Sequence, residues 1–239
     1  MTGTLPTTNR MRAVILAAGE ARRLGHLKRG VPKPMLELGG HPIMEHTVEL
    51  CRKAGIRHLF VNLHYHPEII RGYFGDGSKW GVSIQYRNEK SLLGTGGAVK
   101  GFERKLRGQP FLVVYGDNFI PYDLKKIIKR HRKSKAEMSL VVFWKRDVRE
   151  SGVVTMERNG RVAAFHEKPT GRPPSHWVNA GVYVLEPQLL RRMRKGVSDF
   201  GSDVIPDFLE RDVRIMAIQV NRPVIAVDTP DLYKKWIGK

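Results

Sequence analysis

Residues 11–19 read MRAVILAAG, an apolar run that contains one charged residue, Arg12, and ends at Gly19. A short apolar run that stops at a turn residue is typical of a strand buried on both faces of a parallel sheet. The loop after such a strand lies at the carboxyl end of the sheet, where α/β proteins bind their ligands. We therefore expect a central strand over 11–18 and a ligand-binding loop from Gly19 onward.

Strand and helix patterns alternate from this run to about residue 120. The expected strands are 58–63, 82–86 and 111–115, and the expected helices are 42–54, with Gly55 beyond its end, 67–74 and 98–106. This alternation predicts an α/β fold with a doubly wound, mostly parallel sheet.

The second half of the sequence carries shorter strand patterns and predicts a mixed α+β extension of the same sheet. The expected strands are 138–145, 152–156, 162–166, 177–185 and 215–220, and the expected helices are 124–135, 187–195 and 204–210. Residues 1–10 are polar and predict a flexible tail. We expect one domain over 11–239, with halves of about 11–120 and 121–239.

The composition of the 239-residue chain limits the classes of protein to which it can belong. Its 42 lysines and arginines against 23 aspartates and glutamates give a net charge of +19, which favours nucleic acid, anionic lipid or small polyanions such as nucleoside triphosphates as partners. No apolar run approaches the ~18 residues of a membrane span, and residues 1–12 lack the apolar core of a signal peptide. A single cysteine, Cys51, excludes an internal disulfide and indicates a reducing cytoplasm.

The loop after the first apolar run combines small residues with clustered positive charge. Small side chains let the backbone approach a ligand closely, and exposed N–H groups with cations suit a triphosphate. The cations are Arg22, Arg23, Lys28, Arg29 and Lys33. Neither G-x-G-x-x-G nor G-K-[ST] occurs here, which argues against a dinucleotide fingerprint and a P-loop. The alternative is an ordinary solvated loop.

The order LAAG, Arg23-Leu24, Pro32-Lys33-Pro34 resembles the L-A-A-G-x-G-T-R-L … P-K-P pattern of the sugar-phosphate nucleotidylyltransferases. The resemblance implies their Rossmann-like, GT-A-like single domain, with an NTP-binding first half and a sugar-phosphate-binding second half. It assigns catalytic charge neutralisation at the phosphates to Arg23 and Lys33. It assigns nucleotide contacts to Leu16, Ala17, Ala18, Gly19, Glu20, Ala21 and Arg22. Ala21 and Arg22 replace the usual Gly and Thr, and His26-Leu27-Lys28 replaces P-L-T.

A second glycine segment, Leu93–Ala98 (LGTGGA), resembles the L-G-T-A-G-A element of the same family. The resemblance places Gly94 and Thr95 at the nucleotide, with Glu89 nearby at the end of the preceding strand. A helix N-terminus with flexible glycines is the alternative.

Asp117 follows the strand predicted over 111–115, so its carboxylate is expected at the ligand-binding edge of the sheet. One carboxylate with phosphate oxygens suits Mg²⁺, and Gly116-Asp117 resembles the metal-binding aspartate of the family. The second metal aspartate of the usual D-x-G-T-P pattern aligns with Ala226. Asp228 lies two residues on, on the same face of a strand, and is the candidate replacement; the alternative is a turn aspartate.

Three further segments resemble the sugar-binding elements of the family. Glu167-Lys168-Pro169 resembles E-K-P, which assigns sugar hydroxyls to Glu167 and the sugar phosphate to Lys168. Gly152 matches the glycine of Y-G-V-V, although Ser151 replaces the tyrosine, and Asn179 matches N-A-G. Each string alone is common, but their order along the chain matches that of the family.

The resemblance implies a nucleotidylyltransferase that converts a sugar 1-phosphate and an NTP to an NDP-sugar and pyrophosphate by direct in-line attack. It implies Mg²⁺ at Asp117 and Asp228, a mannose-, heptose- or related hexose-type sugar, and GTP before UTP, CTP or dTTP. The alternatives are a non-catalytic regulatory or nucleic-acid-binding homologue, favoured by Ala226, Arg22 and the net charge, and a glycosyltransferase, which the absence of D-x-D disfavours. The basic segments 125–135 and 191–195 are interpreted as solvated helix faces that attract anionic substrates; neither a membrane nor a nucleic acid is expected as partner.

Overall fold

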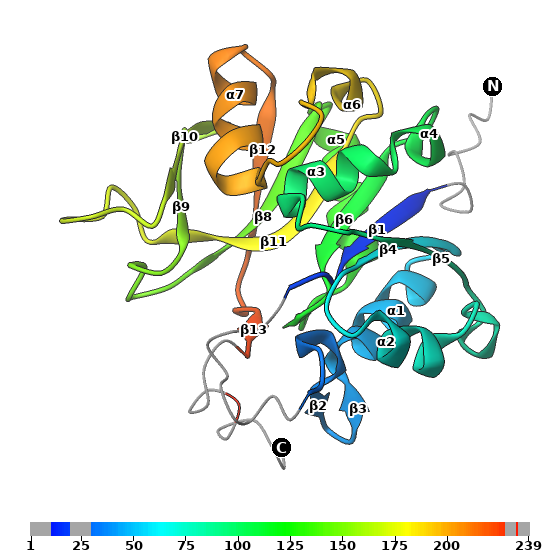
Figure 1. Cartoon of the computed structure of the whole chain (residues 1–239). Helices are drawn as coiled ribbons and strands as arrows, with labels where there is room; N and C mark the ends of the chain where they lie inside the picture. Colours follow the sequence, from blue (N-terminus) through cyan, green and yellow to red (C-terminus); the bar gives the residue numbers. More distant parts are fainter. Residues whose placement is uncertain (1–10, 20–29, 228–232, 234–239) are drawn as a thin grey trace.

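The computed structural model describes residues 11–19, 30–227 and 233 (Figure 1). The strands are β1 (Arg12–Leu16), β2 (Glu37–Leu38), β3 (His41–Pro42), β4 (His58–Leu63), β5 (Ser83–Asn88), β6 (Phe111–Tyr115), β7 (Asn118–Phe119), β8 (Met138–Trp144), β9 (Gly152–Met156), β10 (Val162–Glu167), β11 (Trp177–Leu185), β12 (Ile215–Val220) and β13 (Ile225–Ala226). The α-helices are α1 (Ile43–Lys53), α2 (Pro67–Phe74), α3 (Gly94–Gly101), α4 (Glu103–Leu106), α5 (Leu124–Ser134), α6 (Leu189–Arg192) and α7 (Ile205–Glu210).

A nine-stranded sheet forms the centre of the molecule, and β1 lies in its middle. β1 pairs in parallel with β4 on one side and with β6 on the other, and β5 extends the parallel part beyond β4. Successive β1 side chains enter different cores: Ala13 and Ile15 pack on one face, Val14 and Leu16 on the other. The sheet is therefore covered on both faces, which confirms the predicted doubly wound α/β fold.

The two faces are covered by different helices. One core contains apolar side chains of α1, α2 and α5, and the other contains those of α3, α4, α6 and α7. In Figure 1 α1 and α2 lie below the sheet, whereas α6 and α7 lie above it. No helix in the described ranges is long and apolar enough to cross a membrane.

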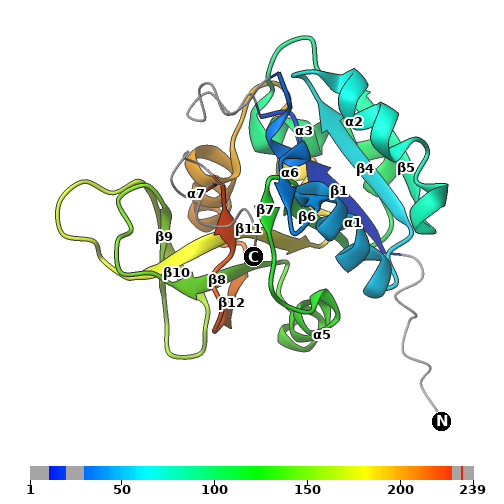
Figure 2. The ribbon, with the colours of Figure 1, turned by 90° about the horizontal axis from the view of Figure 1, so that it is seen from below.

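The second half of the chain extends the same sheet, as predicted. The long strand β11 runs antiparallel to β6 and continues to β8, and β12 joins β8 in parallel. β9 and β10 form an antiparallel hairpin that projects from this end of the sheet (Figure 2). These strands therefore form a wall beside the carboxyl end of β6.

Two predicted helices differ clearly from the structure in their limits, and one helical turn was not predicted. The helix expected over 98–106 begins earlier, at Gly94, and breaks at Phe102, whose ring packs against Phe60 at a centroid distance of 5.5 Å. Of the helix expected over 187–195, only α6 forms. The backbone becomes extended at Met193 and has a positive φ at Gly196, so the helix cannot continue. A π-helical turn, Phe200–Val204, precedes α7 and was not predicted.

Candidate active site

Two cavities open at the carboxyl ends of β1 and β6. The smaller, about 410 Å³, is called the nucleotide arm here, and the larger, about 1000 Å³, the sugar arm. Lys33, Thr95, Tyr115, Asp117 and Asp199 line both cavities. The two arms therefore meet at one junction.

The described residues predicted for the nucleotide and those predicted for the sugar phosphate line different cavities. The nucleotide arm is lined by every described residue predicted to contact the nucleotide: Leu16, Ala17, Ala18, Gly19, Glu89, Gly94 and Thr95. The sugar arm is lined by Gly152, Glu167, Lys168 and Asn179. The remaining candidates, Glu20, Ala21, Arg22, Arg23 and Asp228, lie outside the described residues, as do Lys28 and Arg29.

The floor of the nucleotide arm is held together by two buried polar side chains. The Asn62 side chain at the end of β4 accepts a hydrogen bond from the Ala17 N–H (2.9 Å) and donates one to Glu89 Oε1 (3.0 Å). The other Glu89 oxygen accepts from the Leu93 N–H at 3.0 Å. The two carboxylate oxygens of Glu89 thus connect the first loop, through Asn62, to the glycine segment, so this predicted nucleotide residue also supports the wall that it lines.

The glycine segment is fixed in turn by the chain that precedes α7. Thr95 donates from its N–H and its hydroxyl to Asp199 Oδ1, at 2.9 and 3.0 Å, and its hydroxyl accepts from the Phe200 N–H at 2.8 Å. Gly94 has a φ of +70°, and a Cβ there would lie 2.4 Å from the carbonyl oxygen of Ser198. Only glycine fits this contact between the two segments.

A charged pair occupies the junction of the arms. Lys33 Nζ lies 2.6 Å from Asp117 Oδ2, and the lysine side chain is only 7% exposed. Lys33 is placed by a 3₁₀ turn, Lys33–Met35, and Asp117 by the tight turn after β6. A cation and a carboxylate therefore stand side by side where phosphate charge from both substrates would converge.

The donor set at the junction fits a divalent cation bridged by phosphates. The Asp117 side chain is 29% exposed and lines both arms, so a carboxylate oxygen is accessible there. Among the described residues, no group of three or more acidic, histidine or cysteine side chains is placed so that it could hold a metal ion by itself. One carboxylate completed by phosphate oxygens and water is the arrangement that Mg²⁺ favours.

The strand pair β7–β13, which was not predicted, brings the C-terminal segment to this junction. Ala226 pairs with Asn118, the neighbour of Asp117, and lines the sugar arm. The position that aligns with the second metal aspartate is therefore next to Asp117. Asp228, two residues further on, begins a stretch outside the described residues.

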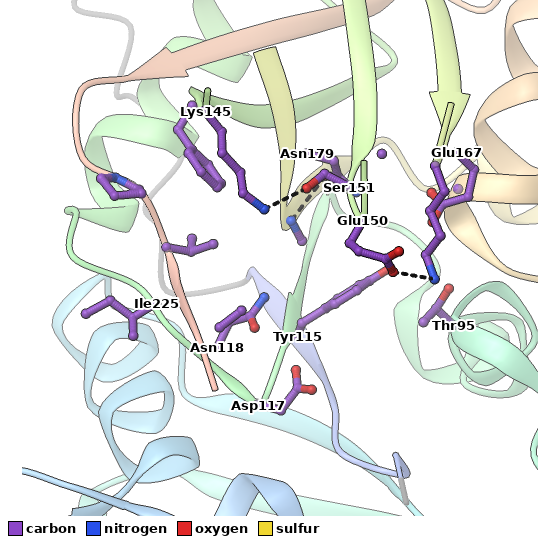
Figure 3. A pocket seen from close by; sticks show the side chains of 18 of the residues that line it. Thr95, Tyr115, Asp117, Asn118, Lys145, Glu150, Ser151, Glu167, Asn179 and Ile225 are labelled. Atoms are coloured by element: carbon purple, nitrogen blue, oxygen red, sulfur yellow. Dashed lines mark hydrogen bonds and ion pairs between the residues drawn. The ribbon is translucent and has the colours of Figure 1, made fainter. Parts of the chain in front are cut away.

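Glu167 stands in the wall of the sugar arm (Figure 3). It lies between two glycines, Gly152 and Gly201. A Cβ on Gly201 would lie 2.4 Å from Glu167 Oε2, and one on Gly152 would lie 3.0 Å from the same atom. Partial burial raises the pKa of Glu167, Lys168 lowers it, and the nearby Asp199 carboxylate raises it by less. The result is a carboxylate held in a fitted slot, suited to accept hydrogen bonds from sugar hydroxyls.

Lys168 and Asn179 have different surroundings from each other. Lys168 is 54% exposed and its ammonium lies 3.7 Å from Glu150, so it can reach a phosphate in the cleft. The Asn179 amide donates to the Tyr183 hydroxyl (2.6 Å), and its oxygen accepts from the Gly181 N–H (3.1 Å). Asn179 thus shapes the cavity floor, since both ends of its amide already have partners in the protein.

Four residues that line or support the two cavities carry no signal in the sequence. Asn62 and Asp199 are isolated polar residues outside any motif, and Tyr115 and Tyr183 look like ordinary strand residues. The Tyr183 hydroxyl lies 3.4 Å from that of Tyr115, and burial raises the pKa of Tyr115 to about 12, so its hydroxyl stays protonated. Only the folded chain brings each of these residues to its partner.

Two curated relatives of this chain are named as enzymes that transfer a nucleotide to a sugar 1-phosphate. Mannose-1-phosphate guanylyltransferase of Mycobacterium tuberculosis is 36% identical over 189 residues, which are 79% of this chain and 52% of that protein. A UTP–glucose-1-phosphate uridylyltransferase of Synechocystis is 30% identical over 226 residues, 88% of this chain and 58% of that protein. The chain thus spans about half the length of the curated relatives it matches.

Solved structures share the fold at lower identity. A Bacillus anthracis protein described as a glucose-1-phosphate thymidylyltransferase, crystallised with sucrose, superposes with a TM-score of 0.85 at 21% identity, covering 94% of this chain and 93% of that one. HddC from Yersinia pseudotuberculosis superposes with a TM-score of 0.80 at 24% identity, covering 95% and 97%. The sequence profile described as "Nucleotidyl transferase" matches residues 12–223, nearly the whole described chain. The chain therefore belongs to the nucleotidyl transferase family.

Proposed function

We propose that the protein joins a sugar 1-phosphate to a nucleoside monophosphate taken from an NTP, releasing pyrophosphate. The observation that supports this most is the junction: the arm lined by the nucleotide motifs and the arm lined by the sugar motifs meet at Lys33 and Asp117. Related proteins whose names carry guanylyl and uridylyl transfer to sugar 1-phosphates support the same reaction class.

The residues at the junction suit a displacement that needs no protein nucleophile. With the sugar phosphate beside Lys168 and the NTP along the nucleotide arm, the sugar phosphate oxygen attacks the α-phosphorus in line as the bond to pyrophosphate breaks. Lys33 neutralises charge on the phosphates, and Arg23 is assigned the leaving pyrophosphate. The work of the protein is then positioning and charge stabilisation.

Asp117, with Asp228 as the proposed second ligand, would hold Mg²⁺ at this junction. A bound Mg²⁺ supplies charge neutralisation for the phosphate oxygens. Asp117 keeps its place because Lys33 donates to one of its oxygens at 2.6 Å.

For the substrates we propose a mannose-, heptose- or related hexose-type sugar, and GTP before UTP, CTP or dTTP. The guanylyltransferase and uridylyltransferase relatives support this order. The lone cysteine, Cys51, is buried and free, which suits the reducing cytoplasm where we place the protein.

The reaction is tested by measuring pyrophosphate release with each NTP against a panel of hexose and heptose 1-phosphates in the presence of Mg²⁺. We expect release with at least one pair and formation of the matching NDP-sugar. If no pair releases pyrophosphate, the proposed function is wrong.

Gly19→Ala tests whether the first loop closes on the nucleotide. A Cβ at Gly19 meets no atom of the described residues within 4 Å, so the variant should fold with an unchanged melting temperature. We expect the KM for NTP to rise about tenfold, because a methyl group would occupy the close approach of backbone to phosphate. Gly72→Ala in α2, also free of contacts within 4 Å, is the matched control. Equal NTP KM values in the two variants would contradict the placement.

Glu167→Gln tests the sugar arm. We expect the KM for sugar phosphate to rise about tenfold with little change for NTP, since a charged acceptor is replaced by a neutral amide. The raised pKa of Glu167 means that the folded protein disfavours its ionised form, so stability is lost as pH rises through that pKa. At neutral pH the variant should therefore melt no lower than the wild type.

The pH dependence of the KM for sugar phosphate is a second test of the role of Glu167. As pH falls through the raised pKa of Glu167, the wild-type KM for sugar phosphate should rise, and this part of the profile should be missing in Glu167→Gln. Glu157→Gln, on the exposed turn after β9, should keep the wild-type profile. Identical profiles for all three proteins would remove Glu167 from sugar binding.

A further inference from the structure

The outer end of the sugar arm is formed where two neighbouring strands stop. β8 and β12 run in parallel, with Phe143 opposite Val220, and the chain leaves both strands at the same edge. Lys145 and Arg146 follow β8, Arg222 follows β12, and all three line the sugar arm. Figure 3 shows Lys145 well away from Asp117, toward the opposite side of the cavity.

None of these three cations forms an ion pair with a carboxylate among the described residues. Arg149 binds the Asp147 carboxylate at 2.7 Å and lowers its pKa, and the charge of Lys145 lowers that pKa further. Lys145 donates to the Ser151 hydroxyl at 3.0 Å, and neither guanidinium forms an ion pair or hydrogen bond there. The other lysines of the cavity each form an ion pair with a carboxylate: Lys33 with Asp117, and Lys168 with Glu150. Since Asp147 pairs with Arg149, the outer end holds a net positive charge, and the phosphate at C1, placed at the junction, does not use it.

An aromatic surface lies beside these cations. Trp144 is 57% exposed and lines the cavity, while its ring stacks on His176 at a centroid distance of 5.6 Å and an angle of 30°. Of the four large apolar side chains that are exposed in the described ranges, three line the two arms: Leu92, Trp144 and Val197. An exposed tryptophan backed by a second ring is a suitable surface for the apolar C–H face of a sugar.

The size of the sugar arm also exceeds what a simple hexose phosphate needs. Its volume of about 1000 Å³ is at the upper end of the range, roughly 300–1,000 Å³, of cavities that enclose drug-sized ligands. A sugar that carries a further substituent away from C1 would fill the space between Trp144 and the outer cations.

We propose that the sugar arm selects a sugar 1-phosphate with a second anionic group remote from C1, a carboxylate or a phosphate, bound by Lys145, Arg146 and Arg222 while its ring stacks on Trp144. This substrate class rests on the proposed function and narrows it. Arginine forks match both anions in a bidentate way, so carboxylate and phosphate share the chemistry that the site recognises.

The test compares matched sugars that differ only in the second anion. Pyrophosphate release is measured with glucose 1-phosphate, glucose 1,6-bisphosphate and glucuronic acid 1-phosphate, and with the corresponding mannose series. We expect kcat/KM to be about tenfold higher or more for an anionic sugar than for its neutral parent, as one or more charge-assisted hydrogen bonds would give. The better of the two anionic sugars identifies the anion.

The variant Arg146→Gln/Arg222→Gln should reduce this anionic-to-neutral ratio about tenfold. Arg158→Gln, which removes an exposed cation from the turn between β9 and β10, is the control and should keep the wild-type ratio. Trp144→Ala should weaken the neutral and anionic sugars alike. Equal kcat/KM for the neutral and anionic sugars, or an equal ratio in the arginine variant and the control, would overturn the proposal.

Calorimetric titration with glucose 1,6-bisphosphate, without nucleotide, separates this inference from the proposed function. If no sugar supports pyrophosphate release, the proposed function is wrong. Binding of the bisphosphate that is tenfold weaker in the arginine variant than in Arg158→Gln would still support the anion site. Binding that is equal in both, or absent from the wild type, would overturn it.

Discussion

Replacing Asp117 by asparagine is expected to lower kcat for pyrophosphate release by about a thousandfold while the fold stays intact. Asparagine has nearly the same shape, so the turn after β6 and the contact with Lys33 can persist. What it removes is the negative charge at the point where both arms meet. An amide oxygen is a weak ligand for Mg²⁺ beside phosphates, and it balances the nearby ammonium less well.

The measurement is a Mg²⁺ titration of pyrophosphate release at saturating NTP and sugar phosphate, with circular dichroism to follow folding. The Lys33 side chain is 7% exposed and 2.6 Å from Asp117, so we also expect a lower melting temperature in the variant. Asp212→Asn is the control, because that carboxylate is 91% exposed and pairs with Arg161 on the surface. Should Asp117→Asn keep a tenth of the wild-type rate, the assignment of the metal and of the reaction centre would be wrong.

The longer strands could be predicted from the sequence, because each contains an apolar run long enough to show a strand pattern. The limits predicted for β4, β6, β9, β11 and β12 agree with the structure residue for residue. β7 and β13 could not be predicted, because two-residue strands carry no periodicity and their pairing joins Asn118 to Ala226 across the chain. That pairing is what brings the C-terminal segment to Asp117.

The residues of the candidate site also differ in whether a local sequence pattern could predict them. Motif spacing predicted Lys33, Asp117 and Glu167, because each follows a strand or turn whose sequence has a recognisable pattern. Asn62 and Asp199 were missed, since each acts through a partner that is distant in sequence: Asn62 through Glu89, and Asp199 through Thr95. A lone polar residue gives no spacing from which such a contact could be inferred.

Gly94→Ala is expected to damage both the fold and the nucleotide arm. The φ of Gly94 is +70°, which costs a side-chain-bearing residue about 1–2 kcal/mol. The added Cβ would also lie 2.4 Å from the Ser198 carbonyl oxygen, which is backbone and cannot move without shifting its segment. A total loss of about 3 kcal/mol corresponds to a fall in melting temperature of roughly 6–12 °C for a chain of this size.

The functional effect follows from the hydrogen bonds on either side of the contact. Ser198 O accepts from the N–H groups of Gly96 and Gly97, at 2.8 and 3.1 Å, and Thr95 is bound to Asp199. Displacing the Ser198 segment would therefore disturb Thr95 and the nucleotide arm. We expect the KM for NTP to rise at least about tenfold.

Gly108→Ala separates the backbone strain from the collision. Gly108 has a φ of +88°, but a Cβ there would meet no atom within 4 Å in the part of the chain that the structure describes, and Gly108 lines neither arm. This variant should lose about 1–2 kcal/mol through its φ alone and keep the wild-type KM for NTP. If the two variants lost equal stability and Gly94→Ala kept its NTP affinity, the close contact between the glycine segment and Ser198 would have no part in holding the nucleotide arm. Loss of NTP affinity in Gly94→Ala alone, at a temperature where both variants are folded, would instead show that this contact shapes the arm.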